Sequence, residues 1–301
     1  MNKIQKVITL FRNKYEFYKS KVQTNYESDL FSWDIRKEIK INGIENKDIL
    51  AENMVFDGSY FLVFSIPKNN SIGLLQAVDP EGTWNYMGEI IQHGQAPHVL
   101  FYEGLWYVFY ADRQRKPWSI SVQTSKSIYG PYGNKHILLN PYEDWERFRC
   151  NEPFVIRFDG RWVMLYMGDS GGNVEQIGIA WSKNLLGPWI KGNNPVIRFG
   201  EAYDKGTVAD PWIYEEHGIY YIGYACSRSR FSPWRTALAL TTDFVNFKKA
   251  GIVLNLGRGW NSECAFRGAL TKFDKTFIFP YTGRSKGHYK IGIAIKNMTN
   301  L

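Results

Sequence analysis

The sequence predicts an all-β protein, a single five-bladed β-propeller made of four-stranded antiparallel blades. Two observations predict it. A pattern of a short polar start, an apolar stretch, a tight turn and an aromatic strand occurs five times along the chain. Aromatic residues also make up 16% of the chain, and they favour strands over helices. Four strands in each of five repeats is the arrangement of a propeller.

Each repeat begins with two strands joined by a tight turn. Clear copies are ENMVFDGSYFLVFS from Glu52 and NEPFVIRFDGRWVMLYMGDS from Asn151. The turns contain Gly58, Gly104, Gly160 and Gly218, which are 46, 56 and 58 residues apart, and Asp274-Lys275 in the fifth repeat. A glycine or aspartate suits a tight turn that needs a positive φ. Each pair of strands is therefore predicted to be a β-hairpin.

Two further strands complete each predicted blade. The third strands are SIGLLQAV, WSISVQTS, QIGIAWS, TALALTT and KIGIAIK, and the fourth segments are TWNYMG, GPYGNK, GPWIKG and VNFKKAG. The fifth repeat stops after its third strand. Residues 30–36, LFSWDIR, resemble the missing piece, so we expect them to supply the outer strand of blade five. This closure removes the exposed edges of an open array. Residues 30–301 are thus expected to form one propeller domain.

Residues 1–29 are expected to form an N-terminal helical extension. Apolar residues recur at helical spacing over residues 3–20, namely Ile4, Val7, Ile8, Phe11 and Tyr15. The predicted helix packs on the outside of the propeller, or else it contacts a membrane surface or a protein partner.

Charge, cysteine content and hydropathy exclude several classes of protein. The net charge is +8, but no compact basic motif occurs beyond the N-terminal stretch, so we expect no nucleic-acid partner. Three cysteines without CxxC spacing argue against a zinc site and against a disulfide framework. The sequence has neither a signal-peptide pattern nor an 18-residue apolar window, which favours a cytoplasmic protein.

Carboxylates are predicted at the propeller axis, because the innermost strand of each blade lines the central channel. The position eight residues before the turn glycine is Ala96, Glu152 and Asp210 in blades two to four. Matching context gives Glu263 in blade five, and a shorter hairpin gives Glu52 in blade one. Clustered carboxylates repel one another and lose solvation, which raises at least one pKa. Such groups serve as acid and as nucleophile or base in glycosidic chemistry.

The same acids have a structural alternative: they anchor the strand starts or bind Ca²⁺ in the channel. Apart from this calcium ion we expect no cofactor. Other polar or aromatic residues near the predicted rim are candidates for substrate binding, namely His98, Asp112, Arg113, Arg149, Asp169, Arg228, Arg267, Arg284 and Trp212. The arginines either neutralise the carboxylates or bind an anionic ligand group such as a uronate, a phosphate or a nucleotide-sugar diphosphate. Loop tryptophans are candidates for sugar stacking: Trp118, Trp145, Trp212, Trp234 and Trp260.

The chain resembles the five-bladed propeller glycoside hydrolases, the superfamily that contains families 43, 32, 68 and 130. The motifs that carry the resemblance are Asn151-Glu152-Pro153, Ala209-Asp210-Pro211 and Ser262-Glu263-Cys264. The pattern departs from the families at Glu52, where blade one usually offers an aspartate, and at Ala96, where blade two usually carries one. A rotated version of the family 32 arrangement makes Glu152 the nucleophile, Asp210 the transition-state stabiliser and Glu263 the acid.

The resemblance implies an enzyme that acts on a glycosidic bond, most simply a glycoside hydrolase with a sugar or oligosaccharide substrate. One alternative is a glycosyltransferase or phosphorylase of polysaccharide biosynthesis that uses a phosphate-bearing sugar donor. The other is a non-catalytic carbohydrate-binding propeller, which the missing acid of blade two favours.

Overall fold

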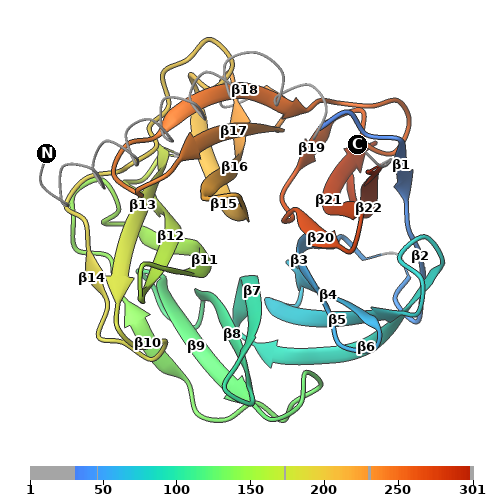
Figure 1. Ribbon diagram of the computed structural model, residues 1–301, viewed down its shortest axis with the longest axis horizontal. Coiled ribbons are helices and arrows are strands. Elements are labelled where there is room, and N and C mark those ends of the chain that lie inside the picture. Colours follow the sequence, from blue (N-terminus) through green and yellow to red (C-terminus); the bar gives the residue numbers. More distant parts are fainter. Residues whose placement is uncertain (1–30, 46, 173, 230–231, 299–301) are drawn as a thin grey trace, which may run out of the picture.

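The computed structural model describes residues 31–45, 47–172, 174–229 and 232–298, and these form five β-sheets arranged in a ring (Figure 1). The predicted five-bladed propeller is confirmed. The helix predicted over residues 3–20, and the extension 1–29 that contains it, lie outside the described residues. Within the described ranges no helix has the length and hydropathy needed to cross a membrane.

The blades follow one another along the chain. Blade one contains β3 (Leu50–Phe56), β4 (Tyr60–Ile66), β5 (Ser71–Ala77) and β6 (Thr83–Gln92). Blade two contains β7 (Gly94–Tyr102), β8 (Leu105–Asp112), β9 (Ser119–Ser125) and β10 (His136–Leu139). Blade three contains β11 (Arg149–Phe158), β12 (Arg161–Asp169), β13 (Glu175–Ser182) and β14 (Ile190–Lys191). Blade four contains β15 (Thr207–Glu216), β16 (Ile219–Ser227), β17 (Arg235–Thr241) and β18 (Lys248–Leu254). Blade five contains β19 (Cys264–Phe266), β20 (Thr271–Phe273), β21 (Thr276–Ser285) and β22 (His288–Asn297).

The segment before blade one closes the ring, as predicted. Strand β1 (Ile35–Glu38) pairs antiparallel with β22 and forms the outer edge of blade five. The strand itself begins later than the predicted segment 30–36, although the Asp34 N–H already donates to the Ile295 carbonyl at 2.8 Å. Strand β2 (Lys40–Asn42), which was not predicted, then pairs parallel with β6. The two short strands therefore link the outer edges of blades five and one (Figure 1).

The hairpin turns have the backbone conformation that the sequence predicts. Gly58, Gly104, Gly160 and Gly218 have φ between 69° and 78°, and Asp274 has φ 53°. No atom lies within 4 Å of a Cβ placed on any of these four glycines. The left-handed backbone, rather than a lack of space, is what favours glycine there.

Aromatic side chains fill the spaces between neighbouring blades. Phe158 of β11 contacts both Tyr220 of β16 and Phe244, with ring centroids 5.4 Å and 5.0 Å away. Trp212 of β15 lies 5.3 Å from Phe279 of β21 in the same way. All three cysteines are buried and free.

A polar cluster recurs in blades three, four and five, in the loop that leads to the inner strand. The first member of each cluster is an acidic or amide residue that comes six residues before Glu152, Asp210 or Arg267. The second is a tyrosine of the second strand, and the third is a lysine or arginine of the outer strand. The clusters are Glu146–Tyr166–Lys191, Asp204–Tyr224–Lys249 and Asn261–Tyr281–Arg36. Because Arg36 belongs to β1, the closing strand completes the cluster of blade five.

Candidate active site

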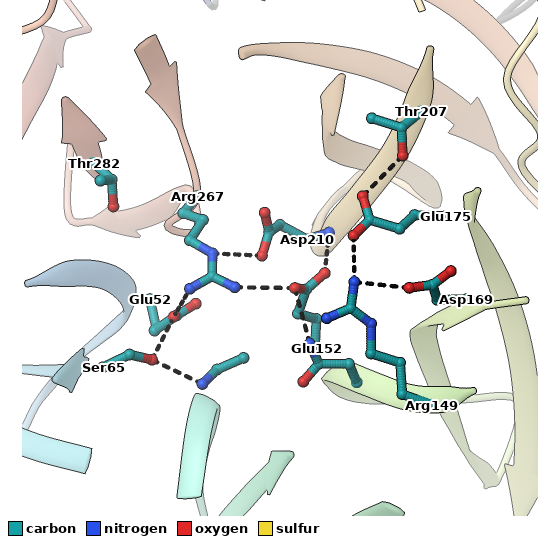
Figure 2. A network of polar contacts seen from close by, with 12 residues as sticks. Glu52, Ser65, Arg149, Glu152, Asp169, Glu175, Thr207, Asp210, Arg267 and Thr282 are labelled. Atoms are coloured by element: carbon teal, nitrogen blue, oxygen red, sulfur yellow. Dashed lines mark hydrogen bonds and ion pairs between the residues drawn. The ribbon is translucent and has the colours of Figure 1, made fainter. Parts of the chain in front are cut away.

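Three carboxylates from three blades share one guanidinium at the centre of the ring (Figure 2). The Arg267 side chain donates from Nε to Asp210 Oδ1 at 2.7 Å and from Nη2 to Glu152 Oε1 at 2.9 Å. Its Nη1 donates to Glu52 Oε1 at 3.1 Å, and Ser65 Oγ donates to the same oxygen. All four ionic side chains are at least nine-tenths buried. The axial charge cluster is therefore one cation held among three acids.

A repeated irregularity of the inner strands brings these residues to the axis. The pairing of inner and second strands shifts register in blades one to four, and the shift in blade five splits the inner strand into β19 and β20. Ala96, Glu152, Asp210 and Arg267 occupy the shift in blades two to five, with φ between 48° and 59°. Residues other than glycine rarely adopt this backbone conformation, and residues strained in this way cluster at functional sites.

Gly268 makes the position of Arg267 possible. It has φ 97°, and a Cβ placed on it would lie 1.7 Å from the Pro280 carbonyl oxygen. The neighbouring backbone of β21 therefore admits only a hydrogen at this point. Arg267 can bend toward the axis because the residue that follows it has no side chain.

A second ionic group lies beside the axial cluster, on blade three. Arg149 Nη2 is 2.7 Å from Glu175 Oε1 and 2.8 Å from Asp169 Oδ2. Thr207 of the next blade donates its hydroxyl to Glu175 Oε2 at 2.8 Å. Figure 2 shows this group next to Glu152, so blade three contributes acids to both.

A cavity of about 340 Å³ is lined by residues of both ionic groups. Its wall includes the charged side chains Arg113, Arg149, Glu152, Glu175, Asp210 and Arg267, and the aromatic rings of Trp234, Phe266 and Tyr289. A smaller cavity of about 20 Å³ lies deeper, with Glu52, Glu152 and Asp210 in its wall. Glu152 and Asp210 line both spaces, whereas Glu52 lines only the deeper one.

Burial changes the protonation of the site. It raises the pKa of Glu52 to about 7, against the opposing effects of Arg267 and Ser65. It also raises the pKa of Asp210 well above its ordinary value, and the charges of Glu152 and Glu52 add to the rise. Burial, together with the charge of Glu152, raises the pKa of Glu175 to about 7. The site thus holds carboxyl groups that carry protons near neutral pH.

Glu175 is expected to make stability depend on pH. A carboxyl whose pKa rises on folding stabilises the fold fully below its unfolded value near 4.5, and this contribution is lost as the pH rises through about 7. We expect the free energy of unfolding of the unsubstituted protein to fall between pH 4.5 and pH 8, and that of Glu175→Gln to fall by about 3 kcal/mol less over the same range. Chemical denaturation at a series of pH values measures both. Glu263→Gln, which changes an exposed carboxylate, serves as control and should follow the unsubstituted protein. Parallel curves for Glu175→Gln and the unsubstituted protein would contradict the raised pKa.

The structure corrects the blade-five position of the predicted catalytic set. Glu263 lies at the surface, 3.6 Å from Arg284, and accepts from the backbone N–H of Lys286 and Gly287. Arg267 takes the equivalent axial place, because the inner strand of blade five ends at Phe266 before the register shift. The rotated assignment with Glu263 as the acid is therefore wrong in its geometry.

Two predicted pocket residues lie in the core instead. His98 is buried against Phe154, 4.0 Å between ring centroids, and its Nδ1 accepts from the Val155 N–H. Burial lowers the pKa of His98 to about 3, so it is neutral there. Trp212 is 1% exposed, lines the smaller cavity and packs against Gly223. Neither ring can stack on a sugar in the larger cavity.

Four further candidates lie away from the cavity wall. Asp112 pairs with Lys135 at 2.5 Å, and exposed Arg228 donates to the Ala202 carbonyl. Arg284 stacks on Tyr289 and pairs with Glu263. Asp169 does not line the cavity either, but it holds Arg149 in place. Of the predicted binding residues, the structure brings Arg113, Arg149 and Arg267 to the wall.

Sequence reasoning missed Glu175 and Tyr289. Glu175 begins the third strand of its blade, and the start of the third strand lies at the same end as the start of the first. Tyr289 pairs with Arg284 at the equivalent end of β22. Counting eight residues back from Lys275, the turn residue of blade five, would have given Arg267 at once.

Within the described ranges, no group of three or more His, Cys, Asp or Glu side chains is arranged to hold a metal ion. The axial carboxylates bind the Arg267 guanidinium as their cation. Calcium in the channel stays a prediction from sequence.

No protein-family model and no curated protein matches the sequence. Solved structures match its fold. One, described only as a glycoside hydrolase, has a TM-score of 0.69 and 15% identity over 89% of this chain and 93% of its own. A thermostable family-43 glycoside hydrolase has a TM-score of 0.68 and 14% identity over 87% and 93%. A family-43 enzyme from Xanthomonas citri, complexed with xylotriose, has a TM-score of 0.61 and 14% identity over 87% and 90%. The chain therefore has the five-bladed fold found in glycoside hydrolases.

Proposed function

We propose that the protein is a carbohydrate-active enzyme that hydrolyses a glycosidic bond. One observation carries the proposal: Glu152 and Asp210, from adjacent blades, share the Arg267 guanidinium and both line the cavity (Figure 2). Glycosidic cleavage needs two carboxyl groups on the two sides of one bond, with different protonation states.

Asp210 is the proposed proton donor. Burial and the neighbouring carboxylates raise its pKa well above the ordinary value, which favours the protonated form that a proton donor needs. Oδ1 accepts from Arg267, and a side-chain hydrogen bond with Glu152 adds to the rise in the pKa of Asp210. In the reaction this proton passes to the leaving oxygen as its bond to the anomeric carbon breaks.

Glu152 is the proposed carboxylate partner. It accepts from Arg267 Nη2, from Asn151 Nδ2 at 3.2 Å and from the Asp210 backbone N–H at 2.7 Å. Three N–H donors suit a charged carboxylate. Glu152 attacks the anomeric carbon directly, or it takes a proton from the water that does so. In either course a water molecule is consumed and both carboxyl groups return to their starting states.

Glu52 and Arg267 are proposed as positioning residues. Glu52 lines only the deeper cavity and accepts from Arg267 and Ser65. Arg267 holds one oxygen of Asp210 and one oxygen of Glu152 in place. This arrangement departs from the blade-one aspartate of the families that the sequence resembles.

The walls of the cavity support a sugar substrate. Trp234 and Tyr289 contribute aromatic rings to the wall, which also contains polar and charged side chains. Ligand sites of this kind combine apolar walls with a few placed polar groups. Three solved structures that share the fold are described as glycoside hydrolases or as a family-43 enzyme, and one of these is complexed with xylotriose.

A second candidate function is non-catalytic sugar binding. The observation that favours it is that Arg267 forms ion pairs with all three axial carboxylates. A structural ion cluster of this kind would hold blades together without taking part in a reaction.

A glycoside panel separates the two candidates. The unsubstituted protein should release the aglycone or a sugar from at least one member of a panel of aryl glycosides and oligosaccharides, neutral and acidic. Glu152→Gln should abolish that activity, and Glu263→Gln, which changes a carboxylate outside the cavity, should keep it. Sugar binding without cleavage, or full activity of Glu152→Gln, would exclude the hydrolase.

A further inference from the structure

Arg113 lies at the cavity wall, in the loop after β8. Its backbone N–H donates to the His93 carbonyl at 2.8 Å, which fixes the start of the loop. Its guanidinium lies over the Trp118 ring, 4.2 Å from the centroid. Arg149 also approaches that ring, at 5.3 Å. The indole therefore holds Arg113 in a defined plane beside the cavity.

The Arg113 guanidinium has no ion-pair or hydrogen-bond partner among the residues that the structure describes, and its Nε is buried. The other two arginines of the wall differ. Arg267 forms ion pairs with three carboxylates, and Arg149 pairs with Asp169 and Glu175. The acid next to Arg113 in sequence, Asp112, pairs with Lys135. Arg113 is thus a cation without a direct ion-pair partner, although the charges of Glu152 and Glu52 also act on it.

A partly buried charge without a direct partner is costly, because it loses hydration without gaining an ion pair. Burial, followed by repulsion from Arg267, lowers the pKa of Arg113 to about 10. Arg113 therefore stays protonated at neutral pH. A cation of this kind at a cavity wall would gain most from a ligand that brings the missing negative charge.

We propose that the cavity binds its sugar through an anionic substituent, a carboxylate, phosphate or sulfate group, which pairs with the Arg113 guanidinium. The planar fork of an arginine matches such groups with two parallel hydrogen bonds. Gln95 and Asn151 also line this wall and can donate to further oxygens. That the ligand is a sugar rests on the proposed function, whereas its anionic group is inferred from Arg113 alone.

Calorimetric titration tests the proposal without requiring catalysis. The probes are glucuronate and galacturonate, the neutral sugars glucose and galactose, glucose 6-phosphate, and inorganic phosphate and sulfate. At least one acidic sugar should bind about tenfold or more tightly than its neutral parent. In Arg113→Gln that preference should disappear. Preference for a uronate, a phosphate or a sulfate identifies which anion the site takes.

Two matched variants control for folding. Arg113→Lys keeps the charge but not the planar fork, so it should keep part of the preference. Arg115→Gln changes an exposed arginine of the same loop and should leave binding unchanged. The proposal is overturned if acidic and neutral sugars bind equally, or if Arg113→Gln keeps the preference.

Failure of this inference differs from failure of the proposed function. Hydrolysis of neutral glycosides with no preference for anions would overturn the role of Arg113 and leave the hydrolase intact. Arg113-dependent binding of an acidic sugar, with no cleavage of any glycoside, would support the anion site and remove the hydrolase.

Discussion

Replacing Arg267 with leucine should destabilise the fold by about 3–5 kcal/mol at neutral pH, as expected when one partner of a buried ionic cluster is removed. The substitution leaves Glu52, Glu152 and Asp210 close together without the guanidinium that all three contact. Urea unfolding at pH 7.5 measures the change. Arg284→Leu is the matched control: Arg284 is half-exposed and pairs with an exposed carboxylate, so its loss should cost less than about 1 kcal/mol.

The deficit of Arg267→Leu should depend on pH. Without the cation, the folded-state pKa values of Glu52 and Asp210, which are already raised, should rise further, because Arg267 lowers both. Raised carboxyl groups stabilise the fold below their unfolded pKa and lose that contribution as the pH rises. The difference between variant and unsubstituted protein should therefore shrink toward pH 5 and grow toward pH 8. A deficit that does not change with pH would mean that Arg267 acts through packing rather than through charge.

Replacing Asp210 with asparagine should slow hydrolysis in a way that depends on the leaving group. A poor leaving group needs the proton that Asp210 supplies, so kcat/KM should fall by about 10²–10⁴-fold. Dinitrophenolate is a good leaving group that departs without being protonated, so kcat/KM for a dinitrophenyl glycoside should fall far less. Steady-state rates on paired substrates with the same sugar measure the difference.

Glu152→Gln provides the contrast for that measurement. Because Glu152 acts at the anomeric carbon, its loss should slow both substrates to a similar degree. Glu263→Gln should slow neither, since Glu263 lies at the surface. Equal losses on both substrates in Asp210→Asn would remove the assignment of Asp210 as the proton donor.

Much of the fold could be predicted because the blade is a local unit. Each hairpin is marked by a residue that tolerates positive φ, and each third strand by small and apolar residues. The closing strand was predictable because blade five lacked an outer strand, but not its first residue, Ile35. The parallel strand Lys40–Asn42 was missed because it has only three residues, of which one is partly buried, and so short a segment shows no periodic pattern.

The site was predictable where the blades repeat and failed where blade five departs from them. Counting from the turn places Glu152 and Asp210 correctly, and the same count gives Arg267. The local likeness of Ser262-Glu263-Cys264 to a family motif led instead to Glu263. His98 is polar and close to the axis in sequence, yet the packing of blades two and three buries its ring against Phe154. Contacts between blades of this kind are not visible in the pattern of one repeat.

The most direct test of the proposed active site is a crystal structure of Asp210→Asn with a bound oligosaccharide that the unsubstituted protein cleaves. The account predicts the anomeric carbon about 3–3.5 Å from a Glu152 oxygen, or from a water molecule hydrogen-bonded to Glu152, with the glycosidic oxygen facing residue 210. A sugar bound elsewhere on the propeller, or in the cavity with its anomeric carbon beyond the reach of Glu152, would contradict it.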